Sequence, residues 1–149
     1  MKVYIDCSQD GSGGRETWLE RKSLDLKICE LKEKLRAVGI IVLDFTTPIE
    51  VLGFDPFSSE IEDFIRIADC VITISGEHHS LGMSGTVINA MRQYRVSGLD
   101  FSRRPHSNTD RYVGVWMGFL PYDSLESIVS SVEIDLRMKG VFDHAFATA

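Results

Sequence analysis

The chain has 149 residues, of which 44% are hydrophobic and 26% are charged. This length and composition predict one globular domain with a single core rather than a disordered chain. The formal net charge is −6. An acidic chain does not attract a phosphate backbone, so binding to bulk nucleic acid is disfavoured, although local amides and arginines can still hold a small anion.

The cysteines and the N-terminal stretch indicate a compartment. Cys7, Cys29 and Cys70 include no CxxC pair, so we expect no disulfide framework and a reducing environment. The first ten residues carry Asp6 and lack the apolar segment of a signal peptide, and no apolar run is long enough to cross a bilayer. We therefore expect a cytoplasmic protein with no membrane partner.

Apolar runs alternate with helical patterns along the first half of the chain. Residues 3–5 predict a first strand, and a glycine-rich loop follows at 8–14. Next comes a long amphipathic helix that Gly39 ends, and residues 40–43 predict a second buried strand. Apolar residues recur in the helix at spacings of four and three, at Leu24, Ile28, Leu31, Leu35 and Val38.

Residues 46–56 contain two prolines and a glycine, which predicts a loop. We expect Ser58 or Ser59 to cap a short helix, and residues 70–74 to form a third strand. The apolar stripe of that short helix is Ile61, Phe64, Ile65 and Ala68.

A second loop of small residues at 75–85 opens a helix. We expect a fourth strand at 95–101, a polar loop at 102–110 and a fifth strand at 112–119. Asp123 or Ser124 is expected to cap a last helix. The inward positions of these two helices are Val87, Ile88 and Met91 in the first and Leu125, Ile128, Val129, Val132 and Leu136 in the second.

This alternation predicts a single α/β domain over residues 1–140 followed by a loose tail at 141–149. We expect a flavodoxin-like or Rossmann-like fold with a five-stranded, mainly parallel sheet and helices on both faces. Ligands of such sheets bind beyond the carboxyl ends of the strands, and both glycine-rich loops fall at that edge.

The two loops are the candidate binding elements. Residues 11–16 contain three glycines but neither a P-loop nor a GxGxxG motif, and they are equally typical of a flexible connection. Residues 80–86 place hydroxyls and glycines at a helix start, where they bind a phosphate or merely cap the helix. His78 and His79 lack a nearby Cys or Asp at metal-ligand spacing, so we expect no metal and no cofactor.

Several short motifs carry a likeness to a known family. Residues 3–8 are followed by Gly-Gly-Arg-Glu at 13–16, an Ala-Asp and an apolar strand occupy 67–72, and Ser-Leu-Gly at 80–82 precedes Gly85-Thr86. The first three resemble blocks of the nucleoside 2-deoxyribosyltransferase superfamily, most closely the 2′-deoxynucleoside 5′-phosphate N-hydrolases, and Gly85-Thr86 resembles the Gly-Thr of related members. The likeness spans roughly residues 1–136.

The resemblance implies cleavage of an N-glycosidic bond by a glutamate nucleophile. Counting from Gly-Thr places that glutamate at Asn89, whereas alignment on Ser-Leu-Gly places it at Thr86, and no acidic residue lies between Glu77 and Asp100. A second family carboxylate falls on Ile61. Three carboxylates are candidates for a relocated catalytic group, namely Glu60, Glu62 and Glu77.

The resemblance also implies a ligand site and an assembly. A homodimer or higher homo-oligomer is expected, in which a neighbouring subunit contributes Ser107 and Asn108. Our first hypothesis is a nucleoside- or nucleotide-binding pseudoenzyme, the second an active N-glycosidase or 2-deoxyribosyltransferase, and the third an interaction protein on this fold. The expected ligand-binding residues are Cys7, Ser8, Gln9, Gly13, Gly14, Arg15, Ser80, Gly82, Ser84, Gly85 and Thr86.

Overall fold

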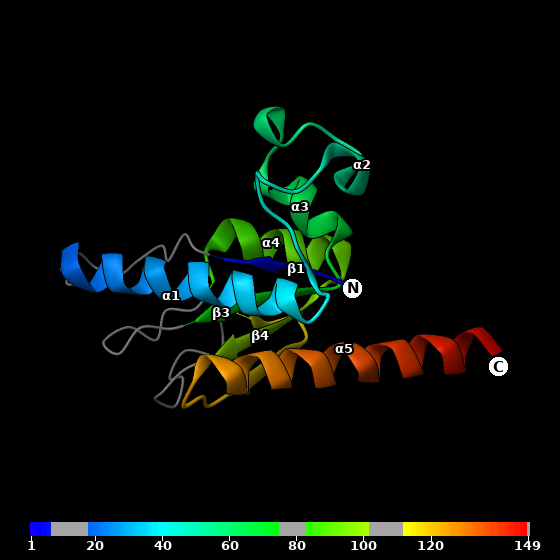
Figure 1. Cartoon of the computed structure of the whole chain (residues 1–149). Helices are drawn as coiled ribbons and strands as arrows, with labels where there is room; N and C mark the ends of the chain where they lie inside the picture. Colours follow the sequence, from blue (N-terminus) through cyan, green and yellow to red (C-terminus); the bar gives the residue numbers. More distant parts are fainter. Residues whose placement is uncertain (7–17, 75–82, 102–111, 149) are drawn as a thin grey trace.

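The computed structural model describes residues 1–6, 18–74, 83–101 and 112–148 (Figure 1). Within these ranges the strands form one five-stranded sheet in the order β2-β1-β3-β4-β5. All neighbouring strands are parallel, which confirms the predicted fold class. The strands are β1 (Lys2–Ile5), β2 (Ile41–Val42), β3 (Cys70–Ile74), β4 (Ser97–Phe101) and β5 (Met117–Leu120).

One face of the sheet is covered by the two long helices α1 (Trp18–Ala37) and α5 (Leu125–Thr148). Figure 1 shows α5 on the side of the sheet away from α3 and α4. The predicted apolar stripes of both helices face this core, with Val38 as the exception because it lies beyond the end of α1 and is exposed. The buried strand residues on this face are Val3, Ile5, Cys70, Ile72, Ile74, Leu99 and Phe101.

The other face is covered by α3 (Ile61–Ile67) and α4 (Gly85–Tyr94), which pack side by side. Val87, Ile88 and Met91 of α4 are buried there, as the sequence predicts. Strands β1 and β3 carry their chain connections to opposite sides, since β2 lies beyond β1 and β4 lies beyond β3. The gap between β1 and β3 is therefore the topological switch point, where doubly wound sheets bind ligands.

The segment between β2 and α3 differs from the sequence prediction. Residues 46–56 are not a plain loop, because they include α2 (Ile49–Leu52), and the 3₁₀ helix η1 (Pro56–Ser58) follows directly. Pro48 starts the first of these helices and Gly53, with φ near 79°, ends it. Neither predicted serine caps α3. The residue at that position is Glu60, whose amide donates to the carboxylate of Asp63 at 2.9 Å.

Two strands begin later than predicted because turns occupy their expected first residues. Arg95 adopts a left-handed conformation at the end of α4, so β4 starts at Ser97. A turn in which the Val115 amide donates to the Tyr112 carbonyl delays β5 until Met117. The second strand is also shorter than predicted, at two residues.

The last helix begins as predicted and ends later. The Ser127 amide donates to Ser124 Oγ at 3.2 Å, so Ser124 is the cap. Helix α5 continues through residue 140 to Thr148, whereas the sequence predicts a loose tail at 141–149. None of the helices within the described ranges is long and apolar enough to cross a membrane.

Candidate functional site

A row of buried polar side chains crosses the α3/α4 face of the sheet near its carboxyl edge. Thr73 of β3 pairs in register with Asp100 of β4. Asp6 directly follows β1, and its amide donates to the Ile72 carbonyl next to Thr73. Each of the three side chains is 1% exposed. We call Asp6, Thr73 and Asp100 the polar row.

The polar row holds the start of α4. The Ser84 amide donates to Asp6 Oδ2 at 2.9 Å, and Ser84 is itself buried. The Met83 amide donates to the Tyr112 hydroxyl at 2.9 Å, and that hydroxyl donates to Asp100 Oδ2 at 3.4 Å. The Asp6 carboxylate therefore holds the Ser84 amide directly, and the Asp100 carboxylate holds the preceding amide through the Tyr112 hydroxyl. Hydrogen bonds to charged groups are stronger than neutral ones.

This arrangement joins the two predicted binding loops at their ends. Asp6 is the last described residue before the first loop, and Ser84 closes the second loop as the N-cap of α4. Ser84 Oγ accepts from the Val87 amide at 3.3 Å, so its hydroxyl caps the helix. The N-terminus of α4 thus lies at the switch point, where backbone amides and the helix dipole favour an anion.

The remaining predicted residues of α4 are exposed. Gly85 and Thr86 lie in its first turn, and nothing lies within 4 Å of a Cβ built at Gly85. Asn89 lies one turn further on, and its Oδ1 accepts from Arg92 Nη1 at 3.0 Å. Arg92 is held in turn, because its Nε donates to the Val113 carbonyl at 2.9 Å.

Two of the three candidate carboxylates lie among the described residues. Glu60 and Glu62 lie at the N-terminus of α3, which runs antiparallel to β3 and so begins at the carboxyl edge of the sheet. Glu60 is exposed and Glu62 is half-buried. The other predicted site residues lie outside the described residues, namely Cys7, Ser8, Gln9, Gly13, Gly14, Arg15, Glu77, Ser80, Gly82, Ser107 and Asn108.

The polar row and Tyr112 were not predicted from the sequence. A signal for the row was present, since Asp100 stands between Leu99 and Phe101 in an apolar strand. A charged residue is rarely fully buried without a partner, so an acid inside a buried strand indicates either structural pairing or a site. Tyr112 carried no such signal, because its role depends on a turn that the sequence pattern placed in a strand.

Neither a metal site nor a nucleophilic thiol in the sheet is present among the described residues. No three His, Cys, Asp or Glu side chains gather there in a way that holds a metal ion. Cys70 is buried in β3, and burial raises the pKa of its thiol to about 12. The thiol is therefore protonated at neutral pH and is a poor nucleophile.

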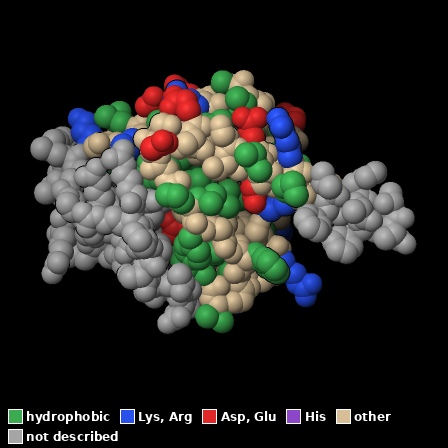
Figure 2. All heavy atoms as spheres, turned by 90° about the horizontal axis from the view of Figure 1, so that it is seen from below, with side chains coloured by type: hydrophobic (Ala, Val, Ile, Leu, Met, Phe, Trp, Pro, Cys, Tyr) green, Lys and Arg blue, Asp and Glu red, His purple; other side chains and the backbone are tan. Residues whose placement is uncertain are grey.

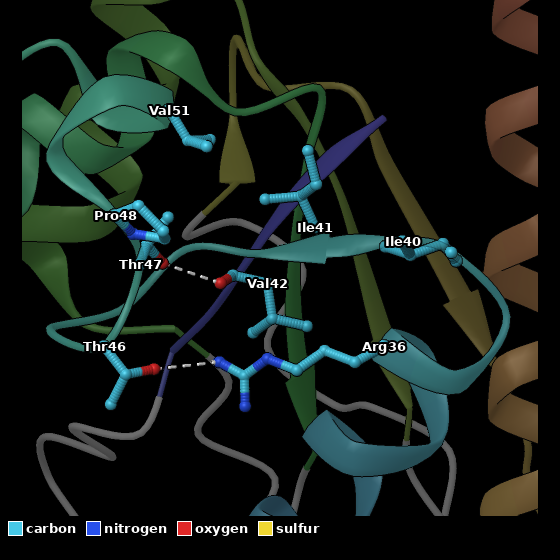
Figure 3. A pocket seen from close by; sticks show the side chains of 9 residues that line it. Arg36, Ile40, Ile41, Val42, Thr46, Thr47, Pro48 and Val51 are labelled. Atoms are coloured by element: carbon cyan, nitrogen blue, oxygen red, sulfur yellow. Dashed lines mark hydrogen bonds between the residues drawn. The ribbon is translucent and has the colours of Figure 1, made fainter.

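A shallow pocket of about 310 Å³ lies beside β2, at the sheet margin (Figure 3). Its lining includes Arg36 at the end of α1 and Thr46 and Thr47 beyond β2. Arg36 Nη2 donates to Asp44 Oδ2 at 2.9 Å and to Thr46 Oγ1 at 3.4 Å. The guanidinium is thus already engaged by the chain. This pocket also lies apart from the switch point, which makes it the weaker candidate for a ligand site.

The fold has a counterpart among solved structures. Over 90% of this chain and 99% of the other, it is similar to the CMP N-glycosidase BcmB of Clostridium botulinum, with a TM-score of 0.52 and 12% sequence identity. A de novo designed Rossmann 2x3 protein matches 92% of this chain with 89% of its own, at a TM-score of 0.42 and 15% identity. No family model and no curated protein matches the chain.

At 12% identity the likeness to BcmB shows a shared fold. The described residues also locate the candidate site at one edge of the sheet. The polar row, the N-terminus of α4 and the first turn of α3 all lie at the carboxyl ends of the strands. This edge combines amides that suit an anion with carboxylates that suit hydroxyl or amino groups.

Proposed function

We propose that this protein binds a nucleoside or nucleotide at the carboxyl edge of its sheet and releases the base slowly or not at all. The main support is the hydrogen bond from the Ser84 amide to Asp6 Oδ2, which brings the ends of the two glycine-rich loops together at the switch point. The fold shared with a CMP N-glycosidase supports this class of ligand.

In this proposal the N-terminus of α4 binds the phosphate. Ser84 and Gly85 begin the helix, and its ten residues provide the dipole. The residues that follow the strands β1 and β3 supply further amides and hydroxyls to the same anion. A sugar hydroxyl donates to carboxylate oxygens at the same edge, because ionised carboxylates only accept hydrogen bonds.

We propose slow base release because of the side chains at the two positions where a nucleophile is expected. Thr86 and Asn89 are both uncharged, and Asn89 is bound by Arg92. An amide has the shape of a carboxylate without its charge, so it neither attacks an anomeric carbon well nor stabilises an oxocarbenium ion. Loss of a covalent nucleophile reduces turnover by several powers of ten.

Titration calorimetry with CMP and dCMP, followed by chromatography for released base, tests the proposal. We expect saturable binding with little free base. Asn89→Glu or Thr86→Glu is expected to raise base release, depending on which position faces the sugar. Gln93→Glu is the matched control, because it adds the same charge to an exposed position in the last turn of α4. Absence of binding to any nucleoside or nucleotide refutes the proposal.

The buried carboxylates favour a second candidate, an active N-glycosidase. Asp6 and Asp100 lie on one face of the sheet with one strand between them, which separates their backbones by about 10 Å. Pairs of carboxylates about 6.5–9.5 Å apart serve inverting glycoside hydrolysis. One takes a proton from the attacking water while the C–N bond breaks, and the other gives a proton to the leaving base.

Base release by the unmodified protein at about 1 s⁻¹ or faster would replace the first proposal with this second one. Asn substitutions at Asp6 and Asp100 and Ala substitutions at Glu60, Glu62 and Glu77 would then identify the carboxylate. A variant that loses base release while it keeps its affinity for CMP marks the catalytic group.

We also propose that the protein is a homodimer or larger homo-oligomer in which a neighbouring subunit completes the pocket. Figure 2 views the side on which α5 lies and shows apolar side chains gathered in the middle of that face. Exposed apolar residues of α5 include Ile134 and Met138, and such patches favour association. Light scattering that gives the mass of a monomer at micromolar concentration refutes this part.

A further inference from the structure

Two phenylalanine rings stand side by side in solvent on the segment between β2 and α3, Phe45 before α2 and Phe57 in η1. Phe57 is 83% exposed and Phe45 is 62% exposed. Their ring centroids lie 6.2 Å apart with an interplanar angle of 23°, so the rings are nearly parallel. Large apolar side chains that gather in an exposed patch are typical of an interaction or ligand-binding surface.

A buried aromatic ring supports this pair from behind. The ring of Phe64, on α3, is buried and meets Phe45 edge-on, with centroids 6.0 Å apart and an angle of 73°. Phe64 also stacks on Tyr4 of β1 at 6.1 Å. The exposed rings are therefore anchored through α3 to the central sheet.

Neighbouring carboxylates fix the backbone next to each exposed ring. Asp44 precedes Phe45, and its Oδ1 accepts at 2.8 Å from the amide of Thr46, the residue that follows Phe45. Asp55 Oδ1 accepts from the amide of Phe57 itself at 3.0 Å. Rings that are fixed before a ligand arrives lose little conformational freedom on binding.

The pair lies towards the same edge of the sheet as the polar row. The Leu43 amide donates to the Val3 carbonyl, so the chain runs beside β1 and reaches Phe45 two residues later, towards the carboxyl end. Phe57 precedes α3, whose N-terminus is at that edge. Strand β2 is two places from β3 in the sheet, which is about 10 Å and suits the reach of a mononucleotide.

We propose that Phe45 and Phe57 form a stacking platform for the base of the bound ligand, while its phosphate lies at the N-terminus of α4. The inference rests on the proposed function and names the part of the ligand that each region contacts. Every nucleobase offers a π-face, so stacking tolerates different bases. The platform therefore selects ligands that carry an aromatic base over bare sugar phosphates.

Paired titrations with AMP and ribose 5-phosphate test this inference, since the two ligands share the sugar phosphate and differ in the base. Phe57→Ala is expected to weaken AMP binding about 5- to 150-fold, because stacking contributes about 1–3 kcal/mol per base and about 1.4 kcal/mol is a factor of ten. Its binding of ribose 5-phosphate is expected to stay unchanged. Phe57→Trp keeps an aromatic face and is expected to retain AMP binding.

The matched control is Trp116→Ala, because Trp116 is 87% exposed and lies just before β5, at the amino end of that strand. This variant is expected to bind AMP as the unmodified protein does. An unmodified protein that binds AMP and ribose 5-phosphate equally well, or a Phe57→Ala variant with unchanged AMP affinity, overturns the platform alone. Failure to bind AMP, CMP or ribose 5-phosphate overturns the proposed function and the platform with it.

Discussion

The face of the sheet beneath α1 and α5 buries apolar strand side chains, whereas the face beneath α3 and α4 also buries the polar row. Both faces are closed to solvent, so burial alone does not distinguish them. The first face stabilises through contact area, which is non-directional. The second uses hydrogen bonds that fix particular atoms, namely the amides of Met83 and Ser84. Stability and ligand positioning are therefore expected to respond to different substitutions.

The largest effect is expected from Phe101→Ala on the apolar face. Phe101 is fully buried in β4, and truncation of a buried phenylalanine costs about 3–5 kcal/mol of unfolding free energy. Urea denaturation measures the loss. The dissociation constant for CMP, measured below the transition, is expected to stay near that of the unmodified protein. A large change in this constant without a loss of stability would contradict the division between the faces.

Asp6→Asn is expected to have the next largest effect and to lower both the unfolding free energy and the affinity for CMP. The Ser84 amide loses a charged acceptor, and hydrogen bonds to charged groups contribute about 1.5–3 kcal/mol. Because Ser84 starts α4, CMP affinity is expected to fall together with the unfolding free energy. Calorimetry on folded protein separates the two quantities. Unchanged affinity would show that Asp6 does not position the bound ligand.

Tyr112→Phe removes one hydroxyl and keeps the ring, which packs edge-on against Phe119 with centroids 5.5 Å apart. The Met83 amide and the Asp100 carboxylate both lose a partner. We expect a loss of about 0.5–1.5 kcal/mol in unfolding free energy, with a measurable fall in CMP affinity. The loss of CMP affinity relative to the loss of unfolding free energy is expected to be larger for Tyr112→Phe than for Phe101→Ala.

Asp44 provides a reference carboxylate outside both faces. Partial burial alone would raise its pKa, but hydrogen bonds from Thr46 and Arg36 and the charge of Lys32 outweigh burial and lower the pKa from 3.8 to about 2. A lowered folded-state pKa means that the ionised form stabilises the fold above pH 4, and that this contribution is lost as the pH falls from about 4 towards 2.

Asp44→Asn is therefore expected to cost about 1 kcal/mol at pH 7, since partly solvated ion pairs are screened. The cost is expected to shrink below pH 4. Thermal melts of both proteins between pH 2.5 and 7 measure the difference. A constant difference across this range would rule out titration of Asp44 as its source.

The sequence predicted the sheet well because buried parallel strands are apolar runs. Residues 70–74 form β3 as predicted. The helix α2 escaped prediction because it has only four residues, between Pro48 and Gly53, and both of those residues are typical of turns. The cap of α3 was predicted wrongly because Ser59 Oγ donates to the Pro56 carbonyl instead, at 2.9 Å.

The sequence predicted which edge of the sheet holds the site, but not which side chains meet there. Strand order cannot be read from apolar periodicity, so nothing in the sequence placed Thr73 beside Asp100 or Asp6 beside Ser84. The stacked pair of Phe45 and Phe57 depends on how the segment between β2 and α3 folds, and no local sequence pattern predicts that. Chemistry that arises from contacts between distant residues needs the three-dimensional fold.

The short edge strand β2 also affects how copies of this protein meet. An unpaired strand edge is a template for addition of another strand, and thus for aggregation. Here the amides of Ile41 and Leu43 turn inward to β1, while the Thr47 hydroxyl donates to the Val42 carbonyl at 3.0 Å (Figure 3). Two residues with one carbonyl already satisfied leave little for a foreign strand to pair with, so this margin resists sheet extension between molecules.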